Sequence, residues 1–172
     1  VDNILVLRGD ADKNSRRFDP DPDGHEHAIG LLRQVMEMNK GKYLDEEMEY
    51  QAPANFSVGV AGYPEKHAEA PNLDSDLIWL KEKVNAGAEY IVTQMFFDNA
   101  RYFDFVARCR KVGINVPIVP GIKPISIKNH LSVLPGTFHV DIPEQLASEV
   151  AKAKDNQTVR QIGIAWATQQ AK

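Results

Sequence analysis

Polar and ionisable residues directly follow four short apolar segments of the chain. The residues at these places are 7–10 (Leu-Arg-Gly-Asp), 61–67 (Ala-Gly-Tyr-Pro-Glu-Lys-His), 93–98 (Thr-Gln-Met-Phe-Phe-Asp) and 120–124 (Pro-Gly-Ile-Lys-Pro). One such group alone could be an ordinary loop or helix cap. Four in succession favour a binding site, because ligands bind at the carboxyl ends of strands in parallel α/β folds. The sequence therefore predicts a small-molecule site at these strand ends.

The apolar segments before these groups are expected to be strands, at residues 3–7, 56–61, 90–94 and 116–120. Their continuous apolar character is typical of strands buried on both faces, as in a parallel sheet. Helical patterns lie between them at 25–38, 74–86 and 100–112, and three more follow at 126–134, 143–153 and 158–172. This β-α alternation predicts an α/β fold with right-handed crossovers.

The ends and faces of the second and third helices can also be predicted. We expect Asp74 and Asn99 to cap their N-termini, and Gly87 and Gly113 to end them. Apolar residues at helical spacing should face the core. They are Leu77, Leu80 and Val84 in the second helix, and Phe103, Val106 and Cys109 in the third.

The composition excludes several classes of protein. The chain has 172 residues, of which 43% are hydrophobic and 26% charged, as in an ordinary globular domain, and we expect residues 1–172 to form one domain. A net charge of -4 offers no basic field for nucleic acid or anionic lipid. No apolar run approaches the roughly 20 residues that span a bilayer, and residues 1–7 lack the features of a signal peptide, so we expect a cytoplasmic protein with small-molecule partners and no membrane contact.

Metal binding is not expected. Cys109 is the only cysteine, which rules out an internal disulfide and a thiolate-rich metal site. Residues 19–24 resemble the start of a calcium-binding EF-hand loop, but two prolines interrupt the motif and Gly30 stands where its last ligand, a glutamate, would be. The neighbouring residues 25–27 (His-Glu-His) could hold a metal, although solvated histidines are commoner.

Taken in order, the strand-end groups resemble the methylenetetrahydrofolate reductase family. The resemblance rests on Leu-Arg-Gly-Asp at 7–10, Gly-Tyr-Pro-Glu-Lys-His at 62–67, the helix 76–84 followed by Ala-Gly-Ala, Thr-Gln-Met-Phe-Phe-Asp at 93–98 and Pro-Gly-Ile at 120–122. It implies a (β/α)8 TIM barrel. Since such a barrel has eight strands and typically about 250 residues, this chain would be roughly its second half.

The resemblance also implies an activity. Such an enzyme passes a hydride from NADH or NADPH to FAD and then, in a ping-pong reaction, to 5,10-methylenetetrahydrofolate, giving 5-methyltetrahydrofolate for one-carbon metabolism and methionine biosynthesis. It would be a homo-oligomer. The family's general acid, a glutamate at the end of the first barrel strand, would precede Val1, so no residue here is assigned that role.

Site residues follow from the resemblance position by position. Catalytic roles fall to Asp10, between the flavin and the pterin, and to Gln94, where nicotinamide and folate alternate. The FAD contacts would be Arg8, Gly9, Asp10, His27, Ala28, Ala61, Tyr63, His67, Asp76 and Lys83, and the folate contacts would be Asp10, Gln94, His130 and Leu134. Three positions depart from the family: His27 replaces a common tyrosine, and Trp79 and Glu82 replace polar and basic residues.

Two other functions stay open. The chain could be a non-catalytic flavin- or folate-binding remnant of the same barrel. It could also belong to a β/α-barrel lyase or aldolase, which would need a lysine at a strand end to form a Schiff base. Lys123 is the candidate for that role.

Overall fold

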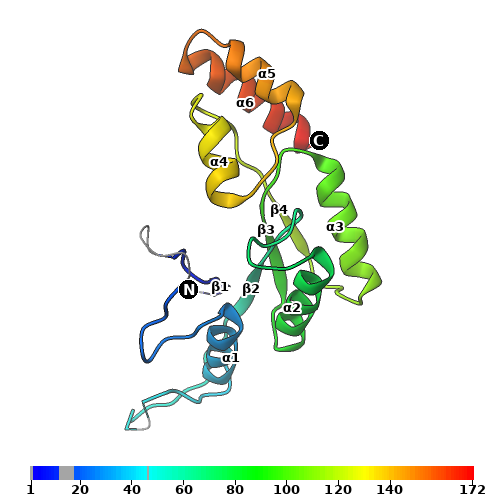
Figure 1. The fold of residues 1–172 in the computed structure, drawn as a ribbon. Coiled ribbons are helices and arrows are strands. Elements are labelled where there is room, and N and C mark those ends of the chain that lie inside the picture. Colours follow the sequence, from blue (N-terminus) through cyan, green and yellow to red (C-terminus); the bar gives the residue numbers. More distant parts are fainter. Residues whose placement is uncertain (1, 12–17, 46) are drawn as a thin grey trace.

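The computed structural model describes residues 2–11, 18–45 and 47–172. Strands and helices alternate at first, and three helices then follow one another (Figure 1). The elements are β1 (Asn3–Val6), α1 (Ala28–Met38), β2 (Ser57–Gly62), α2 (Leu73–Asn85), β3 (Tyr90–Met95), α3 (Asn99–Lys111), β4 (Ile118–Gly121), α4 (His130–Phe138), α5 (Glu144–Lys152) and α6 (Asn156–Gln170).

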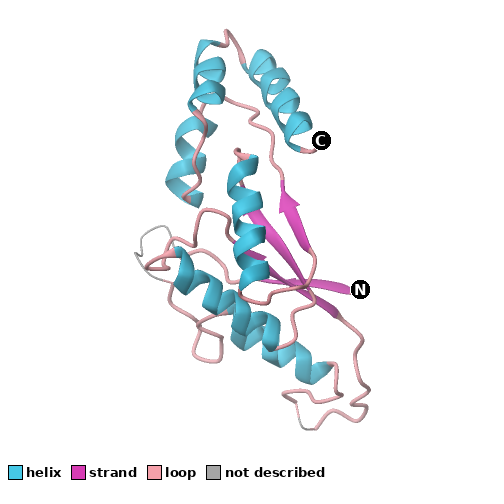
Figure 2. Cartoon of the chain, turned by 90° about the vertical axis from the view of Figure 1, so that its right-hand side faces the viewer, coloured by secondary structure: helices cyan, strands magenta, loops and turns pink. Residues whose placement is uncertain are grey.

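The four strands form one parallel sheet in the order β1-β2-β3-β4. Helices α1, α2 and α3 lie on one side of it (Figure 2). Side chains that point toward these helices are fully buried, among them Val58, Val60 and Ile91, because apolar surface on both elements is removed from water. The predicted fold class is thereby confirmed: successive parallel β-α units make up half of a (β/α)8 barrel.

The other face of the sheet carries no helix from the described part of the chain (Figure 2). The strand register places Leu5 and Val119 on this face, and they are 40% and 46% exposed. Tyr90 lies across Gly59 on the same face, and its hydroxyl donates a hydrogen bond to the Ile4 carbonyl at 3.0 Å. In a closed barrel this face lines the interior, so the open sheet presents the surface from which a barrel core is built.

A second hydrophobic core lies beyond the carboxyl ends of the strands, where α4, α5 and α6 pack together (Figure 1). Leu146, Val150 and Val159 are fully buried in it. Gly163 allows α6 to approach the preceding loop closely, because a Cβ atom there would overlap the carbonyl group of Ile125. This contact fixes α6 against the segment that leaves β4.

Two predicted N-caps were wrong by one or two residues. Asn72, not Asp74, caps α2, since its side-chain oxygen accepts the Ser75 N–H at 2.8 Å. Asp98, not Asn99, caps α3 by accepting the Ala100 N–H at 2.9 Å. Both caps have the extended backbone that an N-cap needs, whereas Asp74 and Asn99 already lie inside the helices.

The buried face of α3 also differs from the prediction. Phe105 and Cys109 face the sheet, whereas Phe103 is 63% exposed and Val106 is half-buried. Tyr102 fixes this rotation of the helix, because its hydroxyl donates to the Ile118 carbonyl at 2.9 Å. In α2 the predicted stripe is confirmed, with Leu77 and Leu80 buried and Val84 packed against them. Gly87 and Gly113 end the two helices with positive φ, as predicted.

Helix α4 begins and ends four residues later than expected. The prediction ended it at Leu134, but the helix continues through Pro135 to Phe138. His139 then ends it in the left-handed conformation, with φ of 53°. The extra turn brings the end of α4 toward the strand ends.

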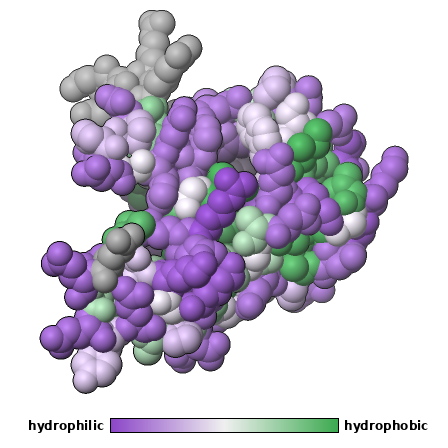
Figure 3. Space-filling model, turned by 90° about the horizontal axis from the view of Figure 1, so that it is seen from below, coloured by the Kyte–Doolittle hydropathy of each residue, from purple (hydrophilic) through white to green (hydrophobic). Residues whose placement is uncertain are grey.

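No helix in the described part of the chain is both long and apolar enough to cross a membrane. Seen from below, the molecule has a mostly hydrophilic surface, with hydrophobic residues gathered on one side (Figure 3).

Candidate functional site

A cavity of about 550 Å³ lies at the carboxyl ends of β1, β2 and β3. The start of α1, one face of α2 and the end of α4 complete its walls. The lining residues are Val6, Leu7, Arg8, Gly9, Asp10, Ala11, His27, Ala28, Ile29, Ala61, Tyr63, His67, Ala68, Glu69, Asp76, Trp79, Glu82, Lys83, Gln94, Thr137, Phe138 and His139. Three of the four strand ends predicted to form a site meet here, whereas residues 120–124 after β4 do not line the cavity. The volume of the cavity is that of a small-molecule site.

All the expected site residues line this cavity except His130 and Leu134. His130 lies at the start of α4, where its Nδ1 accepts the Ser126 N–H at 3.3 Å. Leu134 is 2% exposed and belongs to the second core. The lining residues of α4 come instead from its last turn. Sequence reasoning missed them because it ended the helix before Pro135.

An ion pair joins two loops across the cavity. Arg8, after β1, donates to the Glu69 carboxylate after β2 at 2.6 Å, and the Arg8 guanidinium lies 5.0 Å from the centre of the Phe18 ring. The hydrogen bond from Arg8 lowers the pKa of Glu69, so Glu69 stays ionised at neutral pH. Sequence reasoning missed Glu69, although it lies only two residues beyond His67 on the same strand-end loop.

Tyr63, His67 and Asp76 form a connected group. The two rings meet edge to face with centres 4.7 Å apart, and the His67 backbone N–H donates to Asp76 Oδ2 at 2.9 Å. The Glu69 N–H donates to His67 Nδ1 at 3.1 Å, so a neutral His67 carries its proton on Nε2. Burial lowers the pKa of His67 and raises the pKa of Tyr63. Both side chains are therefore neutral hydrogen-bond donors near pH 7.

Asp76 and Lys83 are seven residues apart, so they lie two turns apart on one face of α2, and this face borders the cavity. The Lys83 ammonium donates to the Ala61 carbonyl at 3.1 Å. Burial lowers the pKa of Lys83, and the nearby charge of Asp76 opposes that shift. The cavity thus holds a carboxylate close to an amine whose pKa is lowered by burial.

Gln94 is oriented by its own strand. Its side-chain oxygen accepts the Met95 backbone N–H at 2.9 Å. This bond assigns the amide oxygen, so the NH2 group is the part of Gln94 that can donate to a ligand in the cavity. Met95 packs against the second core, and Phe96 and Phe97 are 2% exposed, so the three residues beyond Gln94 serve packing.

The start of α1 contributes backbone donors. The N-cap residue His27 makes no side-chain capping bond, and the first turn holds no acidic residue. Ala28 and Ile29 line the cavity at this point. Because the first N–H groups of a helix lack partners within it, this end of α1 can bind an anionic group such as a phosphate.

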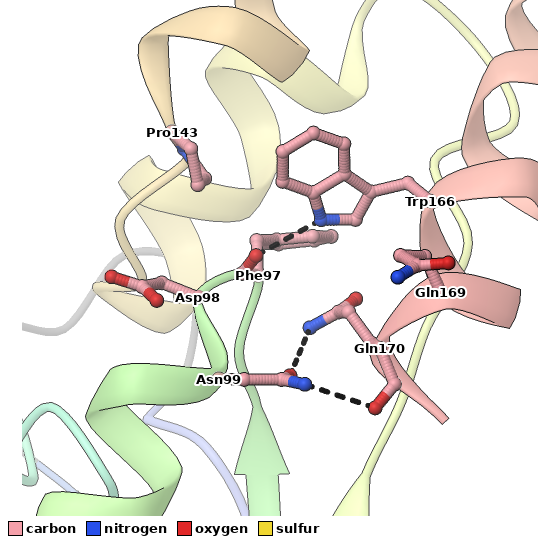
Figure 4. Close-up of a pocket in the computed structure, with 7 residues that line it drawn as sticks. All are labelled: Phe97, Asp98, Asn99, Pro143, Trp166, Gln169 and Gln170. Carbon is pink, nitrogen blue, oxygen red and sulfur yellow. Dashed lines mark hydrogen bonds between the residues drawn. The ribbon is translucent and has the colours of Figure 1, made fainter. Parts of the chain in front are cut away.

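A second cavity, of about 350 Å³, lies between the turn after β3 and the helices α5 and α6 (Figure 4). Its lining residues are Phe97, Asp98, Asn99, Pro143, Trp166, Gln169 and Gln170. Trp166 Nε1–H donates to the Phe97 carbonyl at 2.9 Å, and the Asn99 side-chain NH2 donates to the Gln170 carbonyl at 3.0 Å. No residue expected in the site lines it. Its polar groups mainly hold α6 against the sheet.

The Schiff-base lyase or aldolase considered as an alternative does not have its candidate lysine in the main cavity. The described residues contain no group of three or more histidine, cysteine, aspartate or glutamate side chains that could hold a metal ion. Lys123 is exposed and does not line the main cavity, although a Schiff-base lysine must meet its substrate inside the site.

A family model described as methylenetetrahydrofolate reductase matches residues 1–172. The chain belongs to the methylenetetrahydrofolate reductase family. It is 37% identical to methylenetetrahydrofolate reductase (NADH) 1 of Arabidopsis thaliana over 182 aligned positions, covering 100% of this chain and 28% of that one. It is 37% identical to methylenetetrahydrofolate reductase 2 of Saccharomyces cerevisiae, covering 94% and 25%. A probable methylenetetrahydrofolate reductase (NADPH) of Caenorhabditis elegans is 33% identical, with 94% and 22% covered.

Among solved structures, a Clostridium thermocellum protein described as binding two copies of 5-methyl-5,6,7,8-tetrahydrofolic acid has a TM-score of 0.53 at 14% identity. The match covers 80% of this chain and 55% of that one, and it shows a shared fold. The chain spans about a quarter of the length of its methylenetetrahydrofolate reductase relatives. Family membership and fold class are thus established.

Proposed function

We propose that this chain supplies the flavin- and folate-binding part of a methylenetetrahydrofolate reductase, which reduces 5,10-methylenetetrahydrofolate to 5-methyltetrahydrofolate with NADH or NADPH. The observation that carries the proposal is the meeting of Asp10, Tyr63, His67 and Gln94 in one cavity. These residues come from three different strand ends and are far apart in sequence. Membership of a family whose relatives bear the name of this enzyme supports it.

The side chains of the cavity fit FAD by their chemistry. Arg8, Lys83 and the start of α1 can meet the negative charge of the two phosphates, while Asp76 can accept bonds from ribose hydroxyls. Trp79 is 44% exposed and offers an aromatic face on the α2 side of the cavity. When bound, FAD supplies hydride transfer from the reduced nicotinamide to the folate.

Asp10 and Gln94 are the residues we assign to the reacting end. Asp10 lines the cavity beside Arg8 and Gly9, and a carboxylate there can accept N–H bonds from a pterin. It also places negative charge where an anionic reduced flavin would be disfavoured. The Gln94 NH2 group can donate to the carbonyl of a nicotinamide carboxamide or of a pterin, so one residue can serve both half-reactions.

The test uses the full-length protein and separates the two half-reactions. We expect a flavin absorption band in the purified protein, loss of that band when NADH or NADPH is added without oxygen, and its return when 5,10-methylenetetrahydrofolate follows. A protein that binds flavin but transfers no hydride would support the remnant function instead. A protein without flavin affinity would contradict the proposal.

A further inference from the structure

We infer that Lys66 is a positioning residue for the main cavity. Its ammonium group holds residues 67–70 in the shape that places His67 and Glu69 on the cavity wall. Lys66 itself does not line the cavity. The inference deepens the proposed function and rests on it, because it assigns Lys66 to the construction of the flavin site.

The ammonium group donates to three backbone carbonyl oxygens of the loop that follows it. The distances from Nζ are 2.9 Å to His67, 3.3 Å to Ala68 and 2.7 Å to Ala70. An ammonium has three N–H donors, so these bonds use all of them. Lys66 therefore acts as an internal clamp on a loop of four residues, and its charge strengthens each bond.

The backbone of Lys66 is a second and independent sign of this role. Its φ is 91°, a value that residues with a side chain rarely adopt. Such strain persists only where surrounding contacts determine the conformation. Glycine would adopt this φ without strain, so a lysine here is explained by the bonds that only its side chain can make.

The clamped loop orients two side chains of the cavity. Within it, the Ala70 N–H donates to the His67 carbonyl at 3.0 Å, and the Glu69 N–H donates to the His67 ring. Glu69 in turn accepts the hydrogen bond from Arg8. Release of the clamp would therefore free the His67 ring and the carboxylate that pairs with Arg8.

The experiment compares Lys66→Met and Lys66→Gly with Lys81→Met in the full-length protein. Lys81 is the matched control, because its Nζ also donates to a backbone carbonyl, that of Gly113, away from the cavity. We expect both Lys66 variants to weaken FAD binding about tenfold or more, measured by flavin fluorescence, and Lys81→Met to leave it unchanged. Lys66→Gly should be at least as heat-stable as Lys66→Met, because it removes the backbone strain.

Unchanged FAD affinity in Lys66→Met would overturn the inference. So would full recovery of affinity in Lys66→Gly, because the backbone conformation alone would then suffice. Failure of the unmodified protein to bind FAD would instead contradict the proposed function. In that case the clamp is tested by hydrogen exchange at the Glu69 and Ala70 amides: faster exchange in Lys66→Met than in Lys81→Met supports the clamp, and equal exchange overturns it.

Discussion

The carboxylate of Glu65 accepts the backbone N–H of Asp141 at 3.0 Å. This bond ties the loop after β2, which carries Tyr63 and His67, to the turn between α4 and α5. The other carboxylate oxygen of Glu65 is buried and has no hydrogen-bond partner among the described residues. Two distant segments of the chain are thus joined beside the cavity. The join is unfavourable in one respect, because it buries a carboxylate oxygen without a hydrogen bond.

Replacing Glu65 with glutamine should change how stability depends on pH. Burial raises the pKa of Glu65 above 4.5, so the folded state favours the protonated form. The stability that this form contributes is complete below about pH 4.5 and is lost as the pH rises through the raised pKa. Glutamine keeps an acceptor for Asp141 and cannot ionise. We therefore expect the melting temperature of Glu65→Gln, relative to the unmodified protein, to rise between about pH 4 and pH 7; a constant difference would contradict this.

Gly163→Ala should destabilise the protein by about 1–3 kcal/mol, because the added methyl group overlaps the Ile125 carbonyl and forces α6 away. Denaturant unfolding measures the change. Gly136→Ala is the matched control, since it lies in α4 with open space around its Cβ position, and it should stabilise the helix by up to about 1 kcal/mol. Equal effects of the two substitutions would contradict the packing of α6 described here.

His139 and His130 provide a test of which residues of α4 meet the ligands. His139 lines the cavity, whereas His130 does not. We expect His139→Ala to raise the KM for folate or for the reduced nicotinamide about threefold or more, and His130→Ala to leave both values near those of the unmodified protein. A larger increase in KM for His130→Ala than for His139→Ala would instead favour the folate contact at His130 that the family resemblance implies.

Asp10→Asn should slow the reduction of 5,10-methylenetetrahydrofolate more than the oxidation of the reduced nicotinamide, because only the first half-reaction involves a pterin. We expect the rate constant for folate reduction to fall by about tenfold or more beyond any fall in the rate constant for nicotinamide oxidation. Stopped-flow flavin absorbance measures both rate constants. Equal losses in both half-reactions would count against the role assigned to Asp10.

Much of the fold and of the cavity could be predicted from the sequence, since each strand is a short apolar run followed at once by polar residues. This pattern predicts that Asp10, Tyr63 and Gln94 meet at one edge of the sheet. The caps at Asn72 and Asp98 were missed because several capping residues stand together in each place, and only the backbone conformation selects one. The last turn of α4 was missed because the predicted helix ended at Leu134, just before Pro135, a residue that usually interrupts a helix and here does not.

The Lys66 clamp could not be predicted, because its three acceptors are backbone atoms that leave no trace in residue types. Glu65 was likewise hidden, since its partner Asp141 is 76 positions away along the chain. Glu65 and Lys66 both lie between Tyr63 and His67. The family resemblance assigned site roles to Tyr63 and His67 but none to the residues between them.

The open sheet has a practical consequence for handling residues 1–172 as an isolated polypeptide. β1 and β4 are the outer strands of the described sheet, and each has one side without a neighbouring strand. Exposed edges of this kind pair with other chains, and the apolar face beside them adds to that tendency. We expect the fragment to self-associate when produced alone and to become monodisperse when co-produced with a polypeptide that carries the remaining strands, so the two halves could serve as a reconstitution pair.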